Sequence, residues 1–166
     1  MLSMNIKNIL QGNKYKSIAL TVLMLIIAVK LFAQPYRVYG DCMEPAIKSG
    51  KLYFLNKASP SLHKYQIGDI IVFKHEGKNW ISRVVALEND TIQITENNVI
   101  VNNTALDNTA IHRNWLNWQH GEYAINEPFK IPKDHVFALS DNLSAQHDDS
   151  RVFGPILNSD VLGHIW

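Results

Sequence analysis

A run of apolar residues near the N-terminus stands apart from the rest of the chain. Residues 18–29 read IALTVLMLIIAV without a charge, and after Lys30 the apolar character resumes as far as Ala33. The 17 residues of 17–33 reach the lower limit for a helix that crosses a hydrocarbon core of about 30 Å. The run is apolar on every side, which favours a membrane anchor over a buried amphipathic helix. We therefore expect an uncleaved transmembrane helix over 17–33.

A cleaved signal peptide is the main alternative, because such peptides also have a basic start and an apolar core of this size. Its cleavage site would follow Leu31-Phe32-Ala33, which puts leucine where a small residue is favoured. Residues 1–40 hold five of the 16 basic residues and none of the 15 acids. The positive-inside rule then predicts a single-pass protein of the cytoplasmic membrane, with 1–16 in the cytoplasm and 34–166 as an extracytoplasmic domain.

After residue 40 the pattern changes to short apolar runs separated by Gly, Asn, Pro and Asp. Such runs are typical of strands ended by turns, and no stretch of ten residues has a convincing helical period. The sequence therefore predicts an all-β domain after the anchor. The expected strands are 51–55, 69–73, 80–85, 91–94, 99–101 and 135–139. Residues 104–127 fit neither pattern and are interpreted as a long loop or a small inserted subdomain.

Composition excludes several classes of protein. The 46% hydrophobic and 19% charged content is ordinary for a folded chain, and a net charge of +1 argues against binding nucleic acid through a broad basic surface. The single cysteine, Cys42, can form neither an intrachain disulfide nor a cysteine-based zinc site by itself. The histidines lack the spacing of a metal motif, and no phosphate-binding or dinucleotide-binding glycine pattern occurs. We expect no metal and no cofactor.

Two segments concentrate side chains that could carry chemistry. Cys42 lies in GDCMEP, residues 40–45, where Gly, Asp and Pro favour a bent backbone. A lone cysteine is nevertheless more often a small buried residue than a nucleophile. Residues 140–151 gather acids, His147, Arg151 and hydroxyls. Such a set orders a loop through charge-assisted hydrogen bonds, unless it is simply a solvated acidic loop.

Four motifs, in order, resemble those of the signal peptidase I family. They are CMEP (42–45) with Gly50 following, GDIIVFK (68–74), RVV (83–85), and DN (141–142) followed by DSRVFGP (149–155). The resemblance covers 36–166 and implies a membrane-anchored endopeptidase with an antiparallel β fold. Such an enzyme removes signal peptides from exported preproteins outside the cytoplasmic membrane and uses no metal or cofactor. In the family a serine attacks the scissile carbonyl, and a lysine, or a histidine in the eukaryotic branch, removes its proton.

The chain departs from this pattern at both catalytic positions. Cys42 stands at the nucleophile position, and Ser82 stands at the position of the base, immediately before Arg83. A thiol needs less activation than an alcohol, whereas a serine hydroxyl is no useful base near neutral pH. One hypothesis is therefore a cysteine peptidase in which His147 takes the thiol proton and Asp149 orients His147.

Lys74 is a second candidate base. If the hairpin turned over residues 77–79, Lys74 would face Ser82 across two strands, and a one-residue change in loop length would break that pairing. Asp149 and Arg151 are expected to hold the last motif in shape, and Asp141 is expected to support its loop.

Two other hypotheses stay open on the sequence alone. Substitution of both members of a catalytic dyad is what an inactive homologue would show, and such a protein could bind signal peptides or modulate an active paralogue. Retention of a thiol at Cys42 argues mildly for a peptidase. The third hypothesis is a secreted β-domain binding module, released by signal-peptide cleavage, which the four ordered motifs disfavour.

Overall fold

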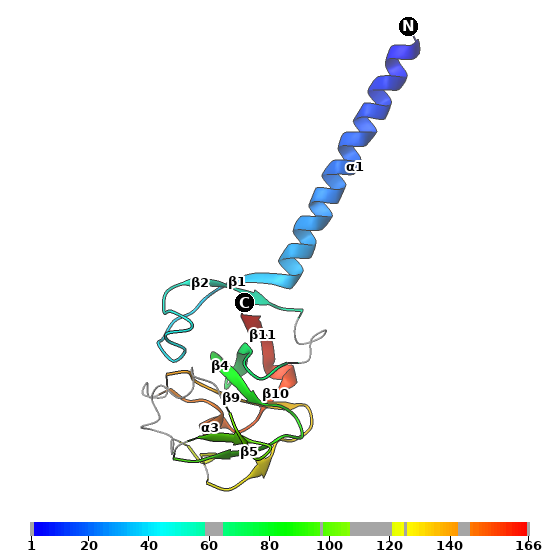
Figure 1. The fold of residues 1–166 in the computed structure, drawn as a ribbon. Coiled ribbons are helices and arrows are strands. Elements are labelled where there is room, and N and C mark those ends of the chain that lie inside the picture. The colour runs from blue at the N-terminus through cyan, green and yellow to red at the C-terminus, as the bar shows by residue number, and fades with distance from the viewer. Residues whose placement is uncertain are drawn as a thin grey trace.

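The chain forms a long N-terminal helix that extends away from a body of two β-sheets (Figure 1). The computed structural model describes residues 2–58, 65–96, 98–106, 121–124, 126–142 and 147–165. The strands are β1 (Ala33–Arg37), β2 (Leu52–Asn56), β3 (Ile70–His75), β4 (Lys78–Ala86), β5 (Thr91–Ile94), β6 (Val99–Val101), β7 (Thr104–Ala105), β8 (Phe129–Lys130), β9 (His135–Leu139), β10 (Ile156–Leu157) and β11 (Val161–Ile165). All pairings among these strands are antiparallel, which confirms the predicted fold class of the body.

The N-terminal helix, α1 (Leu2–Phe32), runs without a break through the boundary predicted between residues 16 and 17. Ala33, which the sequence suggested as the last residue of the anchor, instead opens β1. Large apolar side chains from Ile18 to Phe32 are exposed along α1. The predicted transmembrane helix over 17–33 is nevertheless not supported: within the described residues, no helix combines the length and apolarity needed to cross a membrane.

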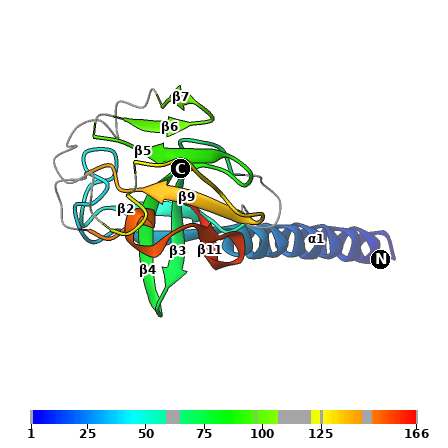
Figure 2. The same cartoon turned by 90° about the horizontal axis from the view of Figure 1, so that it is seen from below.

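The larger sheet brings the two ends of the body together. Its order is β1-β2-β11-β3-β4-β9-β10, so the last strand of the chain lies between β2 and β3. The smaller sheet has the order β7-β6-β5-β8, and Figure 2 shows β5, β6 and β7 side by side beyond β9. A register irregularity between Val84 and Ala86 interrupts the pairing of β4 with β9, where the chain passes towards the smaller sheet.

The larger sheet is covered on both faces. Neighbouring residues of a strand point to opposite faces, so Val72 and Ile81 face one side while Ile71 and Phe73 face the other. The first face packs against Val38, Cys42, Met43 and Ile47, all from the segment between β1 and β2. The second face packs against residues that include Tyr65, Val136 and Ile156. A third cluster, between the sheets, contains Val85, Ala86, Ile92, Ile94 and Phe137.

The six strands expected from the sequence are all present, within two residues of their expected bounds. Five other strands, β1, β7, β8, β10 and β11, were not expected. Two short helices follow β9, namely α3 (Ser150–Phe153) and η3 (Asn158–Asp160). The segment 104–127, interpreted as a long loop or inserted subdomain, begins with β7 at Thr104. Its residues 107–120 and 125 lie outside the described residues.

Candidate active site

Cys42 lies in the loop between β1 and β2, and buried neighbours hold that loop against the sheet. Met43 is completely buried, and Val38 and Ile47 are buried on either side of it. The loop turns tightly, because the Glu44 amide donates to the Asp41 carbonyl at 3.0 Å and the Ile47 amide donates to the Met43 carbonyl at 2.8 Å. This anchoring fixes the backbone that carries the thiol.

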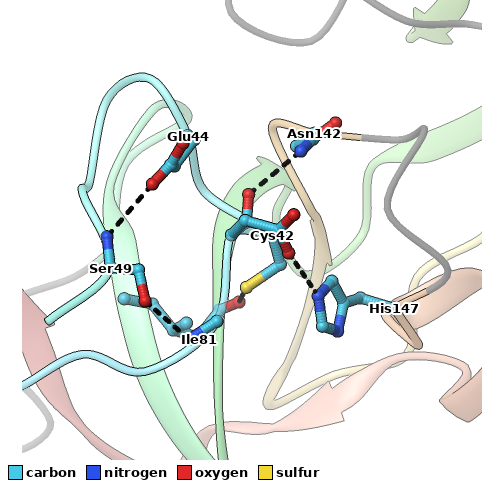
Figure 3. A network of polar contacts seen from close by, with 8 residues as sticks. Cys42, Glu44, Ser49, Ile81, Asn142 and His147 are labelled. Carbon is cyan, nitrogen blue, oxygen red and sulfur yellow. Dashed lines mark hydrogen bonds and ion pairs between the residues drawn. The ribbon is translucent and has the colours of Figure 1, made fainter.

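The thiol of Cys42 is largely withdrawn from water. The residue is 8% exposed, and its Sγ points towards the Ile81 carbonyl oxygen at 4.0 Å (Figure 3). Burial, reinforced by the negative charge of Asp41, raises the pKa of this thiol to about 11. At neutral pH the sulfur therefore keeps its proton, and a group that accepts the proton is needed for efficient attack.

His147 lies beside the Cys42 loop (Figure 3). It contacts Asp41, the residue that precedes the cysteine. The distance from His147 Nε2 to Asp41 Oδ1 is 2.9 Å, and both side chains are partly exposed. The hydrogen bond from His147 lowers the pKa of the Asp41 carboxyl. The ring also lies over Gly40, since a Cβ at that position would be 3.8 Å from His147 Cε1.

Asn142 ties the last motif to the cysteine loop through the backbone. Its amide N–H donates to the Cys42 carbonyl at 2.7 Å, and its side-chain Nδ2 donates to the Asp41 carbonyl at 3.1 Å. With the His147–Asp41 contact, three polar contacts therefore join two loops about a hundred residues apart in sequence. Asp41 and Asn142 were not among the expected site residues, although Asp41 directly precedes the CMEP motif and Asn142 lies inside the DN motif.

Asp149, which was expected to orient His147, binds Arg151 instead, and none of its described contacts is with His147. Its Oδ1 accepts from Arg151 Nε at 2.8 Å and from the Arg151 amide at 3.0 Å, while its Oδ2 accepts from Arg151 Nη2 at 2.8 Å. Oδ2 also accepts from the Ser140 amide at 3.0 Å, and both charged residues are almost completely buried. Asp149 caps α3, so this ion pair holds the last motif in place.

Asp141 makes the second strong ion pair of the site. Arg83 binds its two carboxylate oxygens through Nε at 2.7 Å and Nη2 at 2.6 Å, which is the bidentate geometry of a strong guanidinium–carboxylate pair. Arg83 Nη1 also donates to the Gly68 carbonyl at 2.8 Å. The guanidinium therefore joins β4, the turn before β3 and the last motif.

Ser82, at the expected base position, is buried on β4 at 1% exposure. Its Oγ has no hydrogen-bond partner among the described residues. Ser82 is paired with Ile71, so the two side chains lie on the same face of the sheet. The side chain of Ile81, the neighbouring residue, lies on the other face, and the Cys42 thiol contacts the Ile81 carbonyl. None of the neighbours that the structure describes would make the hydroxyl a proton acceptor.

Lys74 does not face Ser82. The β3–β4 turn consists of Glu76 and Gly77, both with positive φ, and not of residues 77–79. Two positive φ values are what a two-residue type I′ turn requires, and glycine adopts its position without strain. Lys74 is consequently paired with Asn79, on the opposite face from Ser82, and it is exposed.

Within the described part of the chain, no group of three or more His, Cys, Asp or Glu side chains could hold a metal ion. The polar groups gathered around the cysteine loop are instead one thiol, one imidazole, three carboxylates and two guanidinium groups. They are contributed by Cys42, His147, Asp41, Asp141, Asp149, Arg83 and Arg151. The His147 imidazole contacts the carboxylate of Asp41, the residue that precedes Cys42. A thiol, an imidazole and a carboxylate are the groups that nucleophilic acyl transfer through cysteine uses.

Comparison with known proteins points to one family. Residues 12–166 match the family model described as signal peptidase, peptidase S26. Signal peptidase I P of Bacillus subtilis subsp. natto is 27% identical over 150 residues, which are 87% of this chain and 81% of that protein. Signal peptidase IB of Staphylococcus aureus strain COL is 27% identical over 164 residues, 90% of this chain and 84% of that protein.

A solved structure is also similar. The crystal structure of a signal peptidase I from Enterococcus faecalis V583 superposes with a TM-score of 0.51 and 25% sequence identity. The match covers 64% of this chain and all of that one. The similarity therefore extends from the sequence motifs to the fold of the body.

Proposed function

The chain belongs to the signal peptidase family, peptidase S26, and we propose that it is an endopeptidase that removes signal peptides from exported preproteins through Cys42. The observation that carries the proposal is the position of the only thiol of the chain. Cys42 lies in an ordered loop that Asn142 and His147 join to the last family motif. Relatives that cover most of this chain are signal peptidases, which supports the same substrate class.

In the proposed reaction, the Cys42 sulfur attacks the carbonyl carbon of the scissile peptide bond while His147 accepts the thiol proton. The tetrahedral intermediate collapses to a thioester, and the imidazolium gives its proton to the departing amine. Water then attacks the thioester, His147 takes one proton from the water, and the thiol is regenerated. Proton transfer has to accompany the attack, because a thiol with a pKa of about 11 is not ionised beforehand.

An inactive homologue that binds signal peptides is the second candidate. The observation that favours it is the combination of a protonated, buried thiol with a serine at the base position. Both candidates predict binding of signal peptides, and only the first predicts their cleavage.

The test is a cleavage assay with the purified full chain in detergent and a preprotein that carries an Ala-x-Ala site. Wild type should release the mature protein, Cys42→Ala should lose all activity, and a thiol alkylator should inhibit wild type only. Cys42→Ser is the matched variant, since it replaces the thiol with a weaker hydroxyl nucleophile and should retain at most a small residual rate. If wild type cuts no such substrate at any pH while it still binds the signal peptide, the inactive homologue is the correct description.

The proposal includes association with a membrane through α1. Exposed apolar side chains follow this helix from Ile18 to Phe32, and Lys14 and Lys16 precede them. Water is an unfavourable surrounding for so many exposed apolar groups, whereas lipid is not. The chain should therefore stay in the membrane fraction after carbonate washing, and an added protease should reach the β body from the outer side only. A mature chain that begins at Gln34 would contradict the anchor.

A further inference from the structure

We propose that Asp41 is the positioning residue of His147, and that it fixes the imidazole in the tautomer whose Nδ1 keeps a free lone pair to accept a proton. The tautomer can be established independently of activity, whereas its consequence for the reaction rests on the proposed function. The expected orienting group was Asp149, and Asp41 had no expected role.

The contact itself determines the tautomer. His147 Nε2 lies 2.9 Å from Asp41 Oδ1, and an ionised carboxylate can only accept a hydrogen bond. The Asp41 carboxyl stays ionised near neutral pH, because the hydrogen bond from His147 lowers its pKa. Nε2 must then carry the hydrogen of the neutral ring, which leaves the lone pair on Nδ1.

The other two carboxylates of the site are already engaged. Both oxygens of Asp149 accept from Arg151, and both oxygens of Asp141 accept from Arg83. Neither of these buried acids can turn towards His147 without breaking a charge-assisted pair. Asp41 carries no guanidinium partner among the described residues, so its carboxylate is the one available to the imidazole.

The backbone of Asp41 is fixed relative to the thiol. Its carbonyl accepts from Asn142 Nδ2 and from the Glu44 amide, and the carbonyl of Cys42 accepts from the Asn142 amide. The residue that orients the imidazole is therefore bonded covalently to the residue that bears the sulfur. When His147 takes the proton, the Asp41 carboxylate is already in contact with the imidazolium and stabilises it.

The tautomer is measured directly on the full chain in detergent by long-range ¹H–¹⁵N NMR of the histidine rings, with the spectrum of His147→Gln to assign the signal. Wild type should show His147 with hydrogen on Nε2 and a bare Nδ1. Asp41→Ala should lose this preference, and Asp160→Ala, which removes an exposed acid of η3, should keep it. A hydrogen on Nδ1 in wild type, or an unchanged spectrum in Asp41→Ala, overturns the proposal.

The kinetic consequence is measured in the cleavage assay. Asp41→Ala should lower kcat about tenfold or more with KM little changed, and Asp41→Glu should restore part of the rate. In a His147→Ala background, Asp41→Ala should cause no additional loss, because Asp41 acts through the imidazole. Equal losses in both backgrounds would assign Asp41 a purely structural role and overturn the inference. If wild type cuts nothing but the NMR result is as expected, the proposed function fails while the tautomer assignment stands.

Discussion

Alkylation of Cys42 as a function of pH tests how the protein holds its only thiol. The thiolate is the reacting form, and the native pKa of about 11 leaves about one thiol in ten thousand ionised at pH 7. A thiol at its ordinary value of 9.0 would be about a hundred times more ionised. The native rate should therefore rise about tenfold for each pH unit between 7 and 10, with a midpoint near 11.

The assay is intact-mass measurement after timed exposure to iodoacetamide. Cys42 is the only cysteine, so every adduct reports this site. The same chain in guanidinium should react at least about a hundredfold faster at pH 7, because unfolding removes both the burial and the raised pKa. A native midpoint below about 8 would refute the reasoning, since it would mean that a thiolate–imidazolium pair exists before substrate binds.

The same raised pKa predicts how stability depends on pH. The Cys42 thiol ionises at a lower pH in the unfolded chain than in the folded one. Its contribution to the free energy of unfolding is therefore complete below pH 9 and is lost as the pH rises through about 11. The loss amounts to about 3 kcal/mol at most. Urea unfolding at pH 8 and pH 11, with Cys42→Ala as the variant lacking this ionisation, measures it; equal pH dependence in both chains would contradict it.

Three further predictions concern other residues of the site. Arg151→Leu should destabilise the fold by about 3–5 kcal/mol in urea, because it leaves the Asp149 carboxylate buried without its partner, and unchanged stability would show that the pair is not formed. Ser82→Ala should keep the cleavage rate. It should leave the free energy of unfolding unchanged or about 1 kcal/mol higher, because the hydroxyl has no partner among the described residues. A large loss of activity would give Ser82 a catalytic role. Lys74→Met should change kcat by less than about twofold, since Lys74 is exposed and pairs with Asn79 across the hairpin. A loss comparable with that of His147→Ala would make Lys74 the base.

The sequence predicted the longer strands of the body well because their signals are local. Runs such as residues 70–73 and 91–94 are rich in β-branched residues and end at turns, so their length and type follow from neighbouring residues alone. The missed strands lack these signals. β1 contains Pro35 and β11 contains Gly163, two residue types that weaken the sequence pattern of a strand. The strands β7, β8 and β10 are only two residues long.

The site was harder to predict, because its contacts join distant parts of the chain. The family resemblance identified the two motifs that meet, and Cys42, His147, Asp141, Asp149 and Arg151 all lie in or beside them. It could not determine which carboxylate contacts His147, since that depends on a contact 106 residues apart in sequence.

The position of Lys74 depended on a small difference in the hairpin. The turn consists of two residues, Glu76 and Gly77, and this moves the register so that Lys74 and Ser82 lie on opposite faces. Periodicity alone does not determine where such a turn begins.

The central claim is that Cys42 forms a covalent bond with the substrate. Rapid acid quenching of the full chain during turnover of a preprotein, followed by mass spectrometry, tests this most directly. The proposed reaction predicts an adduct on the peptide that contains Cys42, with the mass of the signal peptide less one water, and no adduct in Cys42→Ala. Release of mature protein by Cys42→Ala at the wild-type rate, with no adduct on the wild-type cysteine, would contradict the account.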